Sequence, residues 1–338
     1  MRHPRRLLRL AALLLLIPGL LNIAVTEWEH ARNPVPGRFY PVGGRRMHID
    51  CAGSGSPTVV IEVAASASWL AWQGVQRALS PTTRVCTYDR AGHGWSAPRS
   101  GSRDAQTIVG ELHALLDSAA VRRPVVLAGH SAGGLYVLEY AREFPGEVAG
   151  MALMDASSPR QIDELPGWRA SYEAEKRVRG RKLLMERMAV WSGWERLLGR
   201  CRDTPSRELQ DLAGQYNALM CRPVYVGGDE SEFMHFETSA RQAERVTSLG
   251  DIPLLIMTRD TRRPANAGDA EAIAEDSVWD HEQEEFKKLT PRSWRVVARG
   301  AGHAVQHDRL DLVVRHMTIL VAAVRGGSAP PYGSTVVE

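Results

Sequence analysis

The sequence has little of what metal-binding and nucleic-acid-binding proteins need. Its 338 residues contain only four cysteines, and none of these has the Cys-x-x-Cys spacing typical of zinc sites. The formal net charge is +3, and four arginines among the first nine residues account for it, so the rest of the chain is nearly neutral. This balance argues against a nucleic-acid partner. No residue spacing implies a metal or an organic cofactor.

The sequence also lacks internal repeats and any stretch poor enough in hydrophobic residues to indicate extensive disorder. Hydrophobic residues make up 44% of the chain and charged residues 24%, as in folded globular proteins. The length fits one large α/β domain with an insertion or two ordinary domains. We therefore expect a sizeable hydrophobic core.

The N-terminus has the layout of a secretory signal or a short membrane anchor. Its four arginines precede an apolar run from Leu10 to Val25. Basic residues before such a run place the N-terminus in the cytoplasm and the following chain outside. Because no small-x-small cleavage site follows, residues 1–33 are predicted to be an uncleaved signal anchor and linker. We expect an extracytoplasmic catalytic domain, anchored to the membrane or, if the segment is cleaved, secreted.

Export changes the interpretation of the cysteines, because disulfides persist outside the reducing cytosol. Cys51, Cys86, Cys201 and Cys221 allow three pairings. Their order along the chain favours Cys51 with Cys86 and Cys201 with Cys221. Four buried thiols are the alternative.

Short β-rich runs alternate with helix-length segments over residues 34–158, and the pattern returns over residues 251–325. This alternation predicts a mostly parallel sheet with helices on both faces. Between the two parts, residues 159–250 show only helical patterns, which predicts a helical cap inserted over the sheet edge. Residues 326–338, which include two consecutive prolines, are predicted to be a flexible tail.

A Gly-x-Ser-x-Gly motif occupies residues 129–133, with Ser131 at its centre. It follows the apolar run Val125 to Ala128 and precedes a helical pattern from Leu135 to Phe144. Small residues allow a sharp turn between strand and helix, which exposes the serine at the carboxyl end of the sheet above the dipole of the helix. Motif and context together indicate that Ser131 is a nucleophile.

Three separated motifs make the chain resemble the α/β-hydrolase family from Phe39 to Val324. They are residues 129–133, the stretch Tyr88 to Ser96 after a strand, and the turn Gly300 to His303 after the last strand. The resemblance implies an α/β-hydrolase fold, with a mostly parallel eight-stranded sheet and an inserted helical cap. It also implies a carboxylesterase-like or lipase-like serine hydrolase that acts on a small ester or lipid without a cofactor. The second motif is typically a structural turn, so we assign no chemistry to it.

The resemblance implies the partners of the nucleophile. The family places its general base in the turn after the last strand, which is His303, and His307 is the alternative. Two aspartates at strand ends are candidates for orienting the histidine. We favour Asp155 over Asp260, because the segment before Asp260 is shorter than the family pattern. A capping or ion-pairing role remains the alternative for each aspartate.

The resemblance implies two further features. The backbone N–H groups of Ala132 and of Ala64 or Ala65 would form the oxyanion hole. Many relatives have glycine in the first of these loops, and alanine restricts the φ angles that glycine allows, which would reduce activity. The strand order of the family also places the second strand beside the fourth, which brings Cys51 next to Cys86.

The predicted cap is basic and contains tryptophans, for which two interpretations stay open. A basic amphipathic surface can lie on anionic lipid. Alternatively, the charged groups are solvated while their apolar stems cover the lining of the pocket. The residues concerned are Lys176, Arg177, Arg179, Arg181, Lys182, Arg187, Arg196, Arg200 and Arg202, interleaved with Leu183, Leu184, Trp191 and Trp194.

Together these features predict an ester hydrolase in which Ser131 attacks a carbonyl, His303 relays the proton and water releases the acyl-enzyme. One alternative is amide or peptide cleavage as in prolyl aminopeptidases, which requires acidic cap residues to hold an amine. Another is a non-catalytic binding module, motivated by the alanines in the oxyanion loop. The sequence leaves the substrate and the oligomeric state open.

Overall fold

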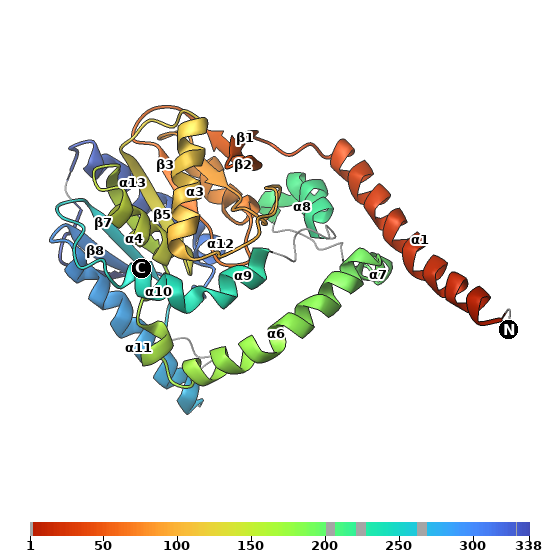
Figure 1. Cartoon of the computed structure of the whole chain (residues 1–338). Helices are drawn as coiled ribbons and strands as arrows, with labels where there is room; N and C mark the ends of the chain where they lie inside the picture. The colour runs from red at the N-terminus through yellow and green to blue at the C-terminus, as the bar shows by residue number, and fades with distance from the viewer. Residues whose placement is uncertain (1–2, 201–206, 221–227, 262–268, 329) are drawn as a thin grey trace.

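A computed structural model of the chain describes residues 3–200, 207–220, 228–261, 269–328 and 330–338. Its centre is a twisted sheet between layers of helices, and the long N-terminal helix α1 projects from this body (Figure 1). A second long helix, α6, runs along the side of the body from near α11 to α7 (Figure 1). The architecture is therefore the predicted α/β arrangement.

Nine strands form one sheet in the order β1-β2-β4-β3-β5-β6-β7-β8-β9. The pairs that β2 makes with β1 and β4 are antiparallel, and all the other pairs are parallel. The sheet is thus mostly parallel, as predicted, with one strand more than the eight expected. The strands span Arg38–Val42 (β1), Arg45–Ala52 (β2), Val59–Glu62 (β3), Val85–Tyr88 (β4), Val125–His130 (β5), Val148–Met154 (β6), Leu254–Thr258 (β7), Ser293–Val297 (β8) and Thr335–Val337 (β9).

The ninth strand lies in residues 326–338, so the prediction of a flexible tail is wrong for this part. Thr335 pairs with Arg295 and Val337 with Val297. The three residues of β9 are β-branched, which suits a strand, and the exposed edge of β8 supplies the hydrogen-bond partners. The consecutive prolines form a turn before the strand, in which Ser334 N donates to Pro331 O at 3.1 Å.

Helices cover both faces of the sheet. α3, α4 and α10 pack on one face, and α2 and α13 pack on the other. Successive strand residues alternate between the two apolar clusters, as Val126 and Leu127 do, because side chains along a strand point to opposite faces. These helices and two near the site span Gln73–Leu79 (α2), Ala105–Ser118 (α3), Gly133–Glu143 (α4), Phe236–Ala243 (α10), Ala270–Glu285 (α11), Val305–Asp308 (α12) and Leu310–Val324 (α13).

The segment between β6 and β7, residues 159–250, is called the cap segment below. In the part of it that the structure describes, every regular element is a helix. α6 is the longest of these helices, at 24 residues. Besides α10, they span Gln161–Glu164 (α5), Trp168–Trp191 (α6), Trp194–Leu197 (α7), Arg207–Leu212 (η2), Ala213–Met220 (α8) and Gly228–Met234 (α9).

The N-terminal helix α1 (His3–Arg32) packs against α6 and α8 of the cap segment. Asn22 Nδ2 donates to Val190 O at 2.8 Å, and Arg196 donates to Asn22 and Glu29 at 2.9 and 2.7 Å. No helix among the described residues has the length and apolar character that crossing a membrane requires.

The predicted bridge between Cys51 and Cys86 is present. The two residues are directly opposite each other on β2 and β4, and their sulfur atoms are 2.07 Å apart. Cys201 and Cys221 lie outside the described residues.

Candidate active site

Ser131 lies in the sharp turn between β5 and α4. Its φ angle is 53°, in the left-handed region that non-glycine residues rarely adopt, so the surrounding structure must hold it there. Two backbone N–H groups donate to its carbonyl oxygen at 2.9 Å, those of Gly134 and Ser157. The turn therefore has the strained geometry that the motif predicts for an exposed nucleophile.

Two glycines of the motif are required by close backbone contacts. A Cβ atom on Gly129 would lie 2.5 Å from the carbonyl oxygen of Gly133. A Cβ atom on Gly133 would lie 2.5 Å from the carbonyl oxygen of Glu62 on β3. Because real Cβ atoms do not approach so closely, larger residues at these positions would push the turn away from the sheet.

The structure brings His303 and Asp155 together. Asp155 directly follows β6, and His303 lies in the loop between β8 and α12. His303 Nδ1 donates to Asp155 Oδ2 at 2.6 Å. The carboxylate is completely buried and accepts three more hydrogen bonds, from Trp279 Nε1 at 2.9 Å, from Arg259 N at 3.1 Å and from the Arg259 guanidinium at 3.3 Å. These bonds fix both the carboxylate and the imidazole that it contacts.

The surroundings of Asp155 keep it ionised. Burial by itself raises the pKa of a carboxyl group, but the hydrogen bond from His303 and the charge of Arg259 outweigh it, and the pKa of Asp155 lies below its usual value. The guanidinium of Arg259 is 3.3 Å from Asp155 and 3.0 Å from Asp276, and it lies over the ring of Trp279. The sequence interpretation gave Arg259 no role, and its position directly after β7 was the only signal.

The second candidate acid, Asp260, contacts the backbone of the loop that leads to His303. Its carboxylate accepts a hydrogen bond from Gly300 N at 3.0 Å, and its own N–H donates to Ala301 O at 3.1 Å. Both contacts hold the loop that leads to His303. The imidazole of His303 donates its hydrogen bond to Asp155 instead.

Two further histidines lie near His303. His307, the alternative base, is exposed on α12 and is not among the described residues that line the cavity around Ser131. His130 is buried beside the nucleophile, and its Nε2 donates to the backbone oxygen of His303 at 2.9 Å. Burial lowers the pKa of His130 to about 4, so its ring is neutral at physiological pH. His130 thus supports the loop of His303.

Ser131 and His303 line one cavity of about 340 Å³, a volume typical of small-molecule sites. Its wall is mostly aromatic and apolar, and most of these side chains come from the cap segment. Two charged side chains, Arg259 and Glu275, also line it. The apolar and aromatic wall residues are Leu165, Trp168, Tyr172, Phe233, Phe236 and Trp279.

The residues predicted to supply the oxyanion donors differ in their position relative to the cavity. Ala132, directly after the nucleophile, and Ala65, in the loop after β3, both line the cavity with Ser131. Ala64 is not among the described lining residues, and its carbonyl oxygen accepts a hydrogen bond from Arg90 at 2.8 Å. Of the two alternatives in this loop, the geometry favours Ala65.

The motif from Tyr88 to Ser96 forms a structural turn. The buried carboxylate of Asp89 accepts hydrogen bonds from His48 Nδ1 at 2.8 Å, from Trp69 N at 2.9 Å and from Trp95 N at 3.0 Å. These bonds satisfy buried donors from three separate parts of the chain. The absence of a chemical role for this motif remains an interpretation.

The sequence interpretation missed a buried ionic cluster between the core and the cap segment. Arg90 contacts Glu62 on β3 at 2.5 Å and Glu232 on α9 at 2.9 Å, and all three side chains are about 1% exposed. Burial disfavours a charge on Glu232, but the charges of Arg90 and His93 outweigh it and hold its pKa far below the usual value. Arg103 adds a second cation at 3.4 Å. Its members are distant in sequence, so no local pattern indicated the cluster.

The chain was compared with known proteins. A model described as the alpha/beta hydrolase family matches residues 14–316. An uncharacterised protein of Schizosaccharomyces pombe is 27% identical over 323 residues, which cover 83% of this chain and 55% of that protein. The first three curated relatives are matched over about a fifth to just over half of their own length.

Solved structures show the same fold. A thermophilic esterase from Thermogutta terrifontis has a TM-score of 0.62 at 17% identity and covers 86% of this chain and 99% of its own. The haloalkane dehalogenase DatA from Agrobacterium tumefaciens has a TM-score of 0.62 at 18% identity, over 85% and 96% of the two chains. One fold therefore supports different reactions, and the chemistry has to be argued from the site.

Proposed function

The chain belongs to the alpha/beta hydrolase family, and we propose that it is a serine hydrolase that cleaves carboxylic esters through an acyl-enzyme intermediate. One observation carries the proposal. Ser131 and His303 line the same cavity, and His303 Nδ1 is hydrogen-bonded to the buried, ionised carboxylate of Asp155. A nucleophile, a base and an orienting acid are the parts that acyl transfer requires.

In the proposed reaction the Ser131 hydroxyl attacks the ester carbonyl while His303 Nε2 accepts its proton. The bond from Nδ1 to Asp155 holds the imidazole in the tautomer that leaves Nε2 free to act as the base. The developing imidazolium is stabilised by the Asp155 charge. His303 then protonates the leaving alcohol, and an activated water hydrolyses the acyl-enzyme in the same manner.

The proposed oxyanion hole consists of the backbone N–H groups of Ala132 and Ala65. Two preorganised donors stabilise the negative oxygen of the tetrahedral intermediate. Support comes from the position of both residues on the wall of the Ser131 cavity. The left-handed φ angle of 59° at Ser66, next to Ala65, shows that the loop makes a tight turn there without glycine.

The walls of the cavity favour an ester with an apolar acyl group of small or medium size. Aromatic side chains of the cap segment, including Trp168, Tyr172 and Phe236, form most of its apolar surface. Arg259 and Glu275 lie on the polar side of the same cavity. A volume of about 340 Å³ fits a small molecule more readily than a long acyl chain.

The nucleophile and the cap segment argue against other reactions of this fold. Dehalogenases and epoxide hydrolases of the family need an aspartate where this chain has Ser131. An aminopeptidase needs an acidic cap residue to hold the substrate amine, whereas the described cap residues that line the cavity are uncharged.

We further propose that the catalytic domain lies outside the cytoplasm. The basic residues before the apolar run Leu10 to Val25 favour this orientation. The bridge between Cys51 and Cys86 supports it, since cytosolic reductants would not preserve such a bond. A periplasmic or extracellular reporter fused after residue 338 should be active, and an inactive reporter would contradict the proposal.

The catalytic proposal is tested with the full-length chain and four proteins: wild type, Ser131→Ala, Asp155→Asn and Asp260→Asn. Wild type should hydrolyse p-nitrophenyl butyrate and react with a fluorophosphonate probe, and Ser131→Ala should do neither. Asp155→Asn should reduce kcat by about 10⁴-fold, because the wrong histidine tautomer is then favoured. Asp260→Asn, the matched control, should retain most activity.

Two results would contradict this assignment. A folded wild-type protein that hydrolyses no short ester and resists the probe would refute the serine-esterase function. A large loss of kcat in Asp260→Asn with little change in Asp155→Asn would keep the function and replace the acid.

A further inference from the structure

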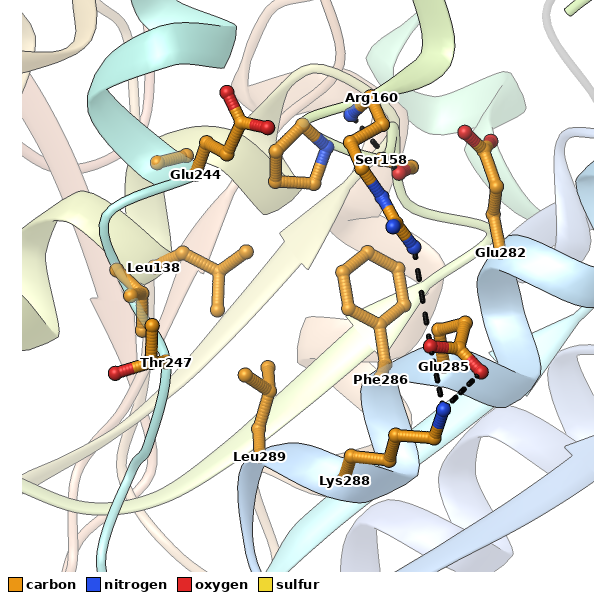
Figure 2. A pocket seen from close by; sticks show the side chains of 13 residues that line it. Leu138, Ser158, Arg160, Glu244, Thr247, Glu282, Glu285, Phe286, Lys288 and Leu289 are labelled. Carbon is orange, nitrogen blue, oxygen red and sulfur yellow. Dashed lines mark hydrogen bonds and ion pairs between the residues drawn. The ribbon is translucent and has the colours of Figure 1, made fainter. Parts of the chain in front are cut away.

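A second cavity, of about 360 Å³, lies behind the segment that carries Asp155. It opens between the start of the cap segment, the end of α10, and α11 with the following helix η4 (Phe286–Leu289). Figure 2 shows its apolar side, to which Leu138, Phe286 and Leu289 contribute. Ser157 lines the catalytic cavity and Ser158 lines this one, so adjacent residues of one segment contribute to the two cavities.

Glu282 on α11 brings a carboxylate to this cavity (Figure 2). Its side chain is only about 1% exposed, yet neither carboxylate oxygen makes a hydrogen bond of good geometry with any residue that the structure describes. Burying a carboxylate without compensating contacts is costly, so such a group is rarely retained in an interior without a purpose.

The cations around the cavity are already matched by other acids. Arg160 is 3.1 Å from Glu164 and 3.8 Å from Glu285, and Lys288 is 2.6 Å from Glu285. On the α10 side, Glu244 pairs with Arg241 at 3.2 Å, outside the cavity. Among the described residues, therefore, no cation is paired with the buried carboxyl group of Glu282, and the charge of Arg160 acts on it only from a greater distance.

The titration of Glu282 agrees with this description. Burial is the largest cause and, with the nearby charge of Glu164, raises the pKa of Glu282 to about 7, although the Ser158 hydroxyl and the charge of Arg160 act in the opposite direction. Near neutral pH the carboxyl group is therefore poised between its two forms. A bound cation would favour the ionised form.

We propose that this cavity is a second ligand site, which binds a small primary amine with its ammonium group on Glu282 and its apolar body against Leu138, Phe286 and Leu289. The ammonium supplies the charge and the hydrogen-bond donors that the carboxylate lacks. The apolar wall buries the hydrocarbon part of the ligand, and the ring of Phe286 is the preferred neighbour of an aryl group. The site does not depend on the esterase proposal.

The charges favour an amine over a carboxylic acid. An anionic ligand would have to displace Glu285 from Arg160 and Lys288, and it would lie near the carboxylate of Glu282. A cationic ligand leaves those pairs intact. The same ammonium chemistry occurs in a free amine and in a lysine side chain of another protein, and the choice of probe distinguishes them.

The test measures binding by isothermal titration calorimetry with the full-length protein. The probes are 2-phenylethylamine, its neutral analogue 2-phenylethanol, and Nα-acetyl-lysine methylamide. We expect the amine to bind at least about tenfold more tightly than the alcohol, because only the amine makes the charged hydrogen bond. Glu282→Gln should remove that preference. Glu275→Gln, a control in the catalytic cavity, should leave amine binding unchanged.

The pH dependence gives a second readout. Between pH 6 and 8 the amine stays protonated while Glu282 ionises, so amine affinity should rise with pH through about 7 and then level off in wild type only. The charged groups that line the cavity or act on Glu282 are Arg160, Glu164, Glu244, Glu285 and Lys288, and all of them are present in both wild type and Glu282→Gln. Tighter binding of the lysine derivative than of the free amine would identify a protein side chain as the occupant.

Three results would overturn the proposal. They are equal affinity for amine and alcohol, undiminished amine binding in a folded Glu282→Gln variant, and loss of amine binding in Glu275→Gln. An absence of detectable amine binding up to about 10 mM at pH 8 would overturn it as well.

Discussion

Replacing Glu282 by glutamine should stabilise the protein, and increasingly so as the pH rises. The pKa of Glu282 is about 7 in the folded protein, whereas the unperturbed side chain of an unfolded protein has a pKa of 4.5. A folded-state pKa above the unfolded value means that the folded protein holds the proton more tightly. The carboxyl group therefore costs no stability well below pH 4.5, costs progressively more as the pH rises to 7, and costs a constant amount above it.

The size of the effect follows from the shift. A difference of about 2.5 pKa units corresponds to about 3 kcal/mol at pH 8, at 1.36 kcal/mol per unit. At pH 5 the same linkage leaves less than about 1 kcal/mol, because the folded carboxyl group is still protonated. The stability advantage of Glu282→Gln should thus grow by about 2 to 3 kcal/mol between pH 5 and pH 8.

The assay is urea unfolding followed by tryptophan fluorescence, at several pH values, for wild type and Glu282→Gln. The difference between the two proteins at each pH cancels the other titrating groups. Glu244→Gln is the matched control, because its side chain lies on the rim of the same cavity but is exposed. A Glu282→Gln advantage that stays constant with pH, or shrinks as pH rises, would refute the reasoning.

Three further predictions concern contacts elsewhere. Glu232→Gln should destabilise the protein by about 3 kcal/mol, because it leaves the buried Arg90 without one of its anions, whereas the half-buried Glu230→Gln should change urea stability little. Reduction of the Cys51–Cys86 bridge, which closes a loop of 35 residues, should cost about 3 to 4 kcal/mol, and an unchanged Tm with dithiothreitol would contradict this. Arg259→Gln should move the acid limb of the kcat/KM profile about one unit to higher pH, because the loss of a cation beside the pair of His303 and Asp155 favours protonation of that pair. An unmoved limb would show that Arg259 does not act on this pair.

The parts of the site that the sequence predicted are those encoded locally. The strand, turn and helix around Ser131 follow from a few adjacent residues, since glycine is needed wherever the backbone packs too closely for a Cβ atom. The sheet was predictable for the same reason, because its strands carry continuous apolar runs. The choice between Asp155 and Asp260 was not, because both follow strands and only the path of the loops decides which carboxylate contacts His303.

Contacts between distant segments were not predictable from one sequence. Arg90 and Glu232 are 142 positions apart, and although Arg90 lies in the motif from Tyr88 to Ser96, nothing in that motif identifies its distant partner. The strand β9 was missed because it has only three residues and its pairing depends on the free edge of β8. Nothing in the neighbours of Glu282 along the chain distinguishes it from the other acids of the same helix, because its burial comes from packing against the cap segment.

The helix α6 bears on how this protein should be prepared. One end of it, with Trp168 and Tyr172, forms the wall of the substrate cavity, and the other end, at Val190, is held by Asn22 of α1. An expression plasmid that begins after residue 33 would delete that support, together with the partners of Arg196. Substrate preferences measured on such a shortened protein would belong to a cavity whose wall helix α6 has lost its contacts with α1. Substrate screening should therefore begin with the intact chain.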